Sequence, residues 1–254
     1  MRLVKFTILT ALLILGRCAS SYSQTSADEL KEAQRLARVA QVAQQEGRLA
    51  DAVKAFETIA VVAKGSPKMV LDAKLAIGDL YMTLGKFDAA ATAARDAISL
   101  DANSAAAHNN LGEALGELKQ YQPALEAFQR AVALDGNYLK ARYNMGVTYD
   151  RLGRLKYAEF VYRILVRDHP DFALGYDSLA VVLSRTGRAR EAIPLHEKAI
   201  SLDPKDSSFY YNFGVSYLVL GDLRAAREQQ QRLHDIDPMM AEHLAAVIAK
   251  HLQQ

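Results

Sequence analysis

The stretch AAAHNNLGEALGELKQYQPALEAFQRAVALDGNY, residues 105–138, decides the fold of this chain. Its first half places apolar or small side chains at steps of three and four residues. Its second half does the same after a short polar stretch at 119–122. Such spacing is typical of amphipathic helices. We therefore predict two helices that form an antiparallel hairpin.

The hairpin pattern recurs with a period of 34 residues, which no single helix or strand has, so a whole structural unit must repeat. An alanine marks the second half of each unit, and a small residue lies twelve positions before it. The alanines are Ala90, Ala124, Ala158, Ala192 and Ala226, and the earlier residues are Gly78, Gly112, Gly146, Ala180 and Gly214. We expect Gly112 to face Ala124 where the two helices of a unit approach closely, since bulky side chains would overpack that contact.

A second set of glycines is predicted to end first helices in a left-handed conformation. These are Gly47, Gly85, Gly153, Gly187 and Gly221. Lys119 takes this place in the third unit, so we expect a less relaxed turn there. Pro170, Pro204 and Pro238 come near the ends of second helices, where proline stops a helix without kinking it.

These features resemble the tetratricopeptide repeat (TPR) family, whose 34-residue unit combines such glycines, alanines, aromatics and a proline. The unit starting at Ser207 matches with Tyr210, Phe213, Gly214, Tyr217, Gly221, Ala226, Leu233 and Pro238. The fifth unit departs from the pattern, with Ala180 for the glycine and His196 for an aromatic. The resemblance implies an all-α fold, a right-handed α-solenoid of helix-turn-helix repeats with a C-terminal capping helix. We expect units near 33–66, 71–104, 105–138, 139–172, 173–206 and 207–240, a linker over 24–32 and the capping helix over 241–254.

The first 23 residues have the zones of a signal peptide. Arg2 and Lys5 precede an apolar run at 6–16, which at about 1.5 Å per residue is too short for a bilayer core of roughly 30 Å. Small residues follow, and cleavage before Gln24 would fit. Alternatively, the segment ending at Cys18 resembles a lipoprotein signal, although Arg17 stands where a small residue is preferred. A buried N-terminal helix is the third interpretation. We expect an exported protein, periplasmic or secreted, with no membrane span in the mature chain and a lipid anchor at Cys18 as the alternative.

Removing this segment changes the charge of the chain. The formal net charge is +2, from 31 Lys and Arg against 29 Asp and Glu. Three of the bases and none of the acids lie in the first 23 residues, so 28 bases then face 29 acids. The apparent basicity is therefore no argument for nucleic acid as a partner. Cys18 is the only cysteine, so the folded part can form no disulfide.

In the TPR family the first helices line a concave surface on which peptides or partner helices bind. The resemblance therefore implies a ligand groove, and asparagine amides there could pair with a peptide backbone. Its expected residues are Asn109, Asn110, Lys140, Tyr143, Asn144, Arg151, Asp177, Arg185, Tyr211 and Asn212. A partly structural role for the same residues is the alternative. The carboxylate clamp of chaperone-binding TPR domains is not expected, because Asp79 would repel a carboxylate.

The sequence favours a protein without catalysis. The six histidines show no metal-ligand spacing with a nearby acid, and His108 and His196 occupy aromatic packing positions. No phosphate loop or nucleophile motif is present, so we expect no metal and no cofactor. We expect a scaffold or adaptor of the bacterial cell envelope that binds a protein or peptide. Alternatives are a TPR lipoprotein assembly factor, similar in layout to pilotins of type IV pili, the substrate-recruiting subunit of a separate enzyme, and a helical array that self-associates.

Overall fold

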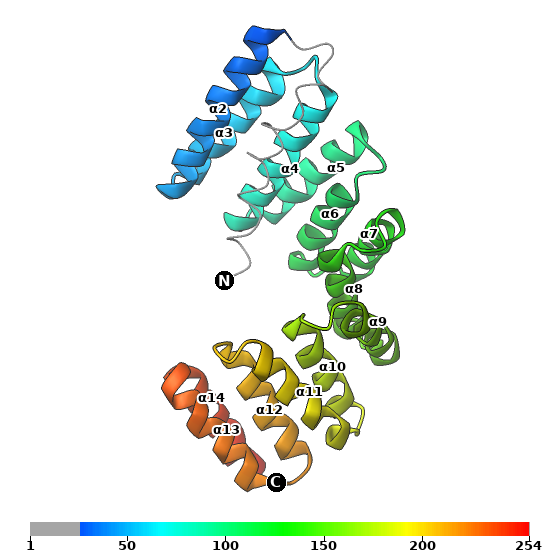
Figure 1. Ribbon diagram of the computed structural model, residues 1–254, viewed down its shortest axis with the longest axis vertical. Helices are drawn as coiled ribbons and strands as arrows, with labels where there is room; N and C mark the ends of the chain where they lie inside the picture. Colours follow the sequence, from blue (N-terminus) through cyan, green and yellow to red (C-terminus); the bar gives the residue numbers. More distant parts are fainter. Residues whose placement is uncertain (1–25, 254) are drawn as a thin grey trace. The chain divides into compact units, whose positions relative to one another are not determined.

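The computed structural model describes residues 26–253, and every secondary-structure element in that range is an α-helix (Figure 1). They are labelled as in the figure: α2 (Ala27–Gln45), α3 (Leu49–Val62), α4 (Pro67–Thr83), α5 (Phe87–Leu100), α6 (Ala105–Glu117), α7 (Tyr121–Leu134), α8 (Leu139–Arg151), α9 (Leu155–Asp168), α10 (Ala173–Arg185), α11 (Ala189–Leu202), α12 (Ser207–Val219), α13 (Leu223–Ile236) and α14 (Pro238–His251). The predicted all-α solenoid of helical hairpins is confirmed.

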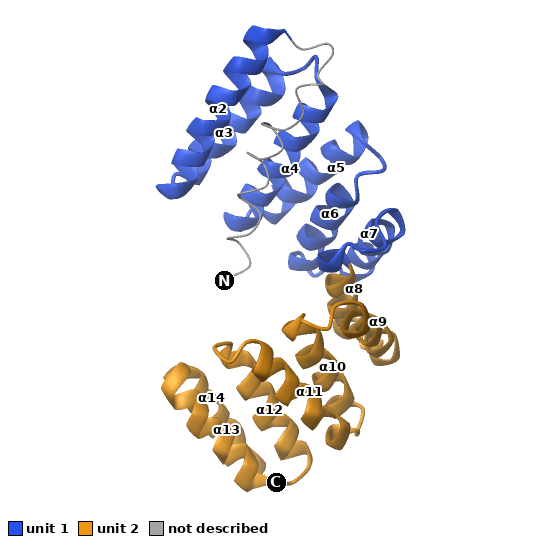
Figure 2. Cartoon of the chain, viewed as in Figure 1, with its two compact units in different colours: residues 1–141 blue, residues 142–254 orange. Residues whose placement is uncertain are grey.

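The chain divides into two compact units, one up to Ala141 and one from Arg142 onward (Figure 2). In the first unit α2 to α6 pack in sequence order, and α4 also contacts α6. In the second unit α10 contacts α12, and α12 contacts α14. First helices of successive repeats therefore pack on one another as well as on their own second helices.

Two helices begin earlier than the sequence analysis expected, and both have capping signals. Ser26 and Glu29 form a capping box, with the Glu29 amide donating to the Ser26 hydroxyl at 3.2 Å. α2 therefore starts inside the expected linker over 24–32. The capping helix starts at Pro238 rather than at 241, because Pro238 occupies its first turn and Asp237 accepts from the Met240 amide at 3.0 Å.

The glycines that end first helices adopt the predicted left-handed conformation. The φ angles of Gly47, Gly85, Gly153, Gly187 and Gly221 lie between 69° and 80°. Lys119 has φ 59° and is the only non-glycine residue with positive φ among residues 26–253. The prediction of a less relaxed turn at Lys119 agrees with this, since a Cβ is unfavourable in that conformation.

At two of the small positions of the first helices, an aromatic ring of the second helix leaves no room for a side chain. A Cβ built on Gly112 would lie 2.6 Å from a ring carbon of Phe128, and one on Gly146 would lie 2.5 Å from Tyr162. The atoms nearest to a Cβ on Gly112 thus belong to the Phe128 ring. The expected approach of glycine and alanine is seen at the equivalent pair of the preceding repeat, where a Cβ on Gly78 would lie 3.9 Å from the Ala90 carbonyl oxygen. Ala124 is itself fully buried.

Candidate functional site

Polar side chains of the first helices join into one chain of contacts in the first unit. Asn110 on α6 donates from Nδ2 to Oδ1 of Asp79 on α4 at 2.9 Å. Asn109 donates to Glu113 at 3.0 Å and lies 3.5 Å from the Asn110 side-chain oxygen. Lys140, at the start of α8, pairs with Glu113 at 2.8 Å. Two carboxylates and one ammonium group therefore share this cluster, which we call the Asp79 cluster.

Ionisation of Asp79 is unfavourable in this cluster. Burial raises the pKa of Asp79 to about 6, since the attraction of Lys140 and the Asn110 hydrogen bond only partly offset desolvation and the nearby charge of Glu113. Burial, together with the charges of Glu113, Asp79 and Asp135, raises the pKa of the Tyr138 phenol to about 12. The cluster thus has an excess of negative charge that a further cation would relieve.

Three of the residues predicted to line the groove are buried. Asn109 is 0% exposed, Asn110 8% and Asp177 5%. A bound peptide cannot touch Asn109 in this structure, so its expected role as a ligand contact is corrected to that of a side chain holding Glu113 in place. Asn110 and Asp177 likewise orient polar neighbours rather than offer an open surface.

In the second unit, Tyr143 belongs to an aromatic group between first and second helices. Its ring lies 6.1 Å from that of Tyr162 and 5.5 Å, edge to face, from that of Phe172. Ser178 is a hydrogen-bond partner of both phenols, and burial raises the pKa of both. Asn144 follows Tyr143 on α8 and is half-buried. Tyr143 is therefore held by packing, with part of its surface still exposed.

The remaining predicted groove residues of the second unit lie at its surface. Tyr211 stacks on His243 of α14, with ring centroids 5.3 Å apart and planes at 5°. Arg185 forms an ion pair with Asp150, and Arg151 is exposed. Lys140, Tyr143, Asn144, Arg151, Arg185, Tyr211 and Asn212 keep solvent exposure, so these are the predicted residues that a ligand could reach.

A buried hydrogen-bond chain connects α10, α11 and α12. Asp177 accepts from Asn212 Nδ2 at 2.7 Å and lies 2.9 Å from His196 Nδ1. His196 Nε2 lies 2.8 Å from the Ser216 hydroxyl, which lies 2.7 Å from that of Ser184. Because an ionised carboxylate only accepts, Nδ1 donates to Asp177. In the neutral imidazole, Nε2 then accepts from Ser216, which accepts from Ser184.

The order Asp177, His196, Ser216 is that of an orienting acid, a base and a nucleophile. His196 is nevertheless 0% exposed and Ser216 1%, and His196 stacks on Phe213 at 5.2 Å. No substrate can reach the hydroxyl in this structure, so the interpretation of His196 as a core residue is confirmed. Ser184 and Ser216 were not among the residues predicted from the sequence. In this repeat Ala180 replaces the usual glycine and His196 replaces the usual aromatic residue. These two replacements were the feature of the sequence that could have indicated an unusual core.

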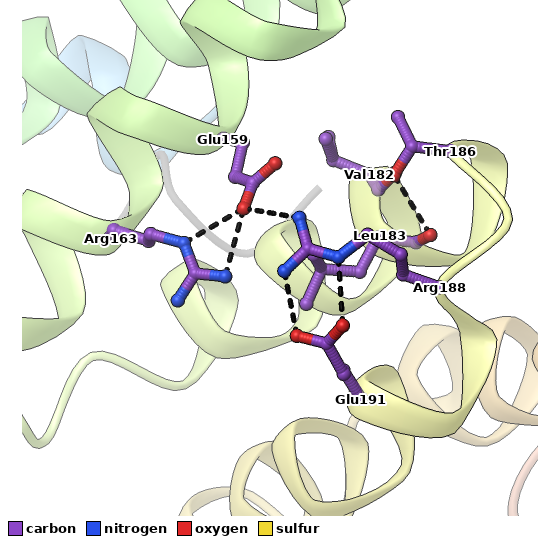
Figure 3. A network of polar contacts seen from close by, with 7 residues as sticks. All are labelled: Glu159, Arg163, Val182, Leu183, Thr186, Arg188 and Glu191. Atoms are coloured by element: carbon purple, nitrogen blue, oxygen red, sulfur yellow. Dashed lines mark hydrogen bonds and ion pairs between the residues drawn. The ribbon is translucent and has the colours of Figure 1, made fainter.

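An ion-pair network joins α9 to the turn between α10 and α11 (Figure 3). Glu159 accepts from Arg163 and from Arg188, each at 2.8 Å. Arg188 also forms a two-pronged pair with Glu191 at 2.8 and 2.6 Å. Burial opposes the ionisation of Glu159, but the bonds from Arg163 and Arg188 lower its pKa below the usual value. The hydrogen bond from Arg188 likewise lowers the pKa of Glu191.

Residues 26–253 contain no group of three or more His, Cys, Asp or Glu residues placed to hold a metal ion. None of the helices over the same range has the length and apolar character needed to cross a membrane. Cys18 and the predicted targeting segment lie outside the described residues, so their roles stay predictions.

The chain was compared with protein-family models, curated proteins and solved structures. Four family models, each described as a tetratricopeptide repeat, match residues 75–138, 140–171, 176–208 and 197–228. No curated protein sequence matches significantly.

Solved structures with a similar fold share little sequence with the chain. A tetratricopeptide repeat protein from Parabacteroides merdae has a TM-score of 0.68 at 16% identity, covering 88% of this chain and 91% of its own. A thermophilic TPR protein of Thermus thermophilus has a TM-score of 0.60 at 22% identity, covering 72% of this chain and 100% of its own. YrrB, described as a TPR protein with an unusual peptide-binding site, has a TM-score of 0.55 at 21% identity, covering 68% of this chain and 91% of its own.

Proposed function

Since the chain belongs to the tetratricopeptide repeat family, we propose that it is a non-catalytic adaptor that binds a peptide segment of a partner protein along its first helices. Protein–protein interaction is the general role that the repeats support. The description of YrrB as a peptide-binding TPR protein agrees with a peptide as the ligand. Within the second unit, the accessible Tyr211 and Asn212 offer an aromatic surface and an amide to a peptide.

The observation that carries this proposal is that the carboxylates of Asp79 and Glu113 share one nearby ammonium group, that of Lys140. Burial raises the pKa of Asp79 to about 6, so an ionised Asp79 at neutral pH lowers the stability of the folded protein. Residues placed at such a cost are frequent at functional sites. Lys140 already places an ammonium group beside Glu113, and a lysine or arginine of the ligand would play the same part for Asp79. The proposed ligand is therefore a peptide with a basic side chain.

The test is a comparison of two peptides that differ only at one residue, lysine in one and glutamine in the other. Binding to the purified protein is measured by fluorescence anisotropy, with Asp79→Asn as the matched variant. We expect the lysine peptide to bind the wild type about tenfold more tightly than the glutamine peptide, the size of one charge-assisted hydrogen bond. The preference should vanish in Asp79→Asn. Equal binding of both peptides to the wild type would refute the basic ligand.

We propose further that the protein is exported to the bacterial envelope, on the strength of the basic, apolar and small-residue zones of the first 23 residues. The lipoprotein version makes a separate prediction. Radiolabelled palmitate should be incorporated by the wild type and not by Cys18→Ser, while a cleaved soluble product would show no label in either. Fractionation of cells into cytoplasm, periplasm and membranes decides whether export occurs.

The absence of catalysis is tested at Ser216, whose hydroxyl contacts His196, which in turn contacts Asp177. A fluorophosphonate probe labels activated serines, and we expect no labelling of the folded protein because Ser216 is 1% exposed. Labelling that disappears in Ser216→Ala would show that the hydroxyl is reachable and would contradict this part of the proposal.

A further inference from the structure

Helix α9 exposes two aromatic side chains on its outer surface. Tyr157 is 61% exposed and Phe160 63%, and they are the only aromatic residues among the exposed large hydrophobic side chains of residues 26–253. They lie three positions apart, so they are neighbours on one helical face. Aromatic side chains dominate the energetics of protein interfaces, and their exposure here has no role in the core.

The structure holds this surface in a defined arrangement. The ring of Tyr157 stacks on that of Tyr149, with centroids 5.3 Å apart and planes at 21°. Arg163, one turn after Phe160, is fixed by its bond to Glu159. A partner would therefore meet a surface that is already ordered, which lowers the entropic cost of binding.

Cations flank the aromatic pair. Lys156, Arg163 and Arg167 follow one another at steps of seven and four residues, so they share the side of α9 next to Phe160. The side chains of Arg163 and Arg167 are 50% and 72% exposed, although each pairs with an acid of its own helix. We call Lys156, Tyr157, Phe160, Arg163 and Arg167 the α9 face.

We propose that the α9 face is a second docking surface, for a protein segment that covers Tyr157 and Phe160 with apolar side chains and meets the cations with acidic ones. The occupant follows from charge complementarity, since the cations beside the rings are more exposed than the carboxylates paired with them. A protein fits better than an anionic membrane, because Glu159 and Asp168 lie among the cations at fixed positions and a uniform anionic surface would repel them. This surface is on a second helix and is separate from the proposed peptide site, which uses first helices.

The experiment uses the full chain and three synthetic helical peptides with the same leucine stripe. The residues flanking the stripe are glutamate, glutamine or lysine, and binding is measured by fluorescence anisotropy at low and high salt. We expect the glutamate peptide to bind about tenfold more tightly than the lysine peptide, and the difference to shrink at high salt. Phe160→Ser should weaken the binding of the glutamate peptide about tenfold or more.

Matched variants separate this surface from others. Val61→Ser on α3 removes an apolar side chain that is 70% exposed and should leave binding unchanged. The double variant Lys156→Glu, Arg167→Glu should reverse the preference toward the lysine peptide, a gain that misfolding cannot produce. Asp79→Asn should leave glutamate-peptide binding intact, so failure of the proposed peptide site and failure of the α9 face are distinguishable.

Three outcomes would overturn the proposal. One is equal affinity for the three peptides, and another is equal weakening by Val61→Ser and Phe160→Ser. The third is Phe160-dependent binding to phosphatidylserine vesicles without any preference for the glutamate peptide, which would assign the face to a lipid surface. Circular dichroism of each variant confirms that it is folded.

Discussion

At the scale of single residues, Asp79 is the position where stability and function are expected to conflict. Asp79→Asn keeps an oxygen that can accept from Asn110 and removes the cost of a desolvated charge. We expect the variant to be more stable than the wild type by about 1–2 kcal/mol at pH 7.5, given about 1.4 kcal/mol per unit of pKa difference. Urea denaturation measures this, and a less stable variant would show that the carboxylate is structural.

The same residue sets a pH dependence with a definite sign. The pKa of Asp79 is raised from 3.8 to about 6 in the folded state, so the folded protein binds more protons between these values. Its contribution to stability is therefore fully present below pH 3.8 and is lost as the pH rises through 6. The difference in stability between wild type and Asp79→Asn should accordingly grow from pH 4 to pH 7 and then level off.

The glycines of the first helices offer a matched pair of substitutions. Gly112→Ala places a Cβ 2.6 Å from the buried ring of Phe128, whereas Gly78→Ala finds no atom of another residue closer than 3.9 Å. We expect Gly112→Ala to lower the free energy of unfolding by about 1–3 kcal/mol. Gly78→Ala should be neutral or stabilising by up to about 1 kcal/mol, because alanine is the better helix former. Equal effects at both positions would contradict the role of the ring.

Lys119 differs from the residues of the other turns, which are glycines, because it holds a positive φ with a side chain. Lys119→Gly should stabilise the protein by about 0.5–1 kcal/mol, because glycine removes the left-handed penalty while adding some freedom to the unfolded chain. The reverse change is Gly153→Lys, at the equivalent turn, where Gly153 has φ 70°. This variant should destabilise the protein by a similar amount. Thermal and urea unfolding of the two variants check the pair.

At the scale of elements, the network around Glu159 fastens α9 to the repeat that follows it. We expect a double-mutant cycle of Glu159→Gln and Arg188→Gln to give a coupling energy of about 0.5–1 kcal/mol, as for ion pairs with partial exposure. The pKa of Glu159 is lowered, so this stability is present above the ordinary pKa of 4.5 and is lost as the pH falls through the lower folded value. A coupling that persists at pH 2 would point to packing instead of charge.

The elements also show what the sequence could and could not predict. The turns at Gly47 and Gly153 were predictable, since the 34-residue period fixes where each first helix must end. The contacts of Asn110 with Asp79 and of Ser184 with Ser216 were not, because they join residues 31 and 32 positions apart on neighbouring helices. Such pairs depend on how each helix is rotated against the next. For the same reason the period placed Asn109 near the groove but could not show that its neighbours cover it.

At the scale of the whole molecule, the two proposals assign binding to two kinds of helix surface. The first helices hold the Asp79 cluster and the accessible residues of the proposed peptide site. The outer surface of α9 carries the exposed rings of Tyr157 and Phe160. An adaptor needs two such surfaces to bring two partners together, and we expect Asp79→Asn and Phe160→Ser each to impair one surface and leave the other intact.

The buried histidine has a practical consequence for solution studies. His196 has both ring nitrogens engaged and no solvent exposure, so its imidazole proton should exchange slowly enough to give a resolved low-field NMR signal. Asn212 touches the same carboxylate and is accessible from the first-helix side. A peptide that contacts Asn212 should therefore shift that signal, so the protein contains its own label-free reporter of ligand binding.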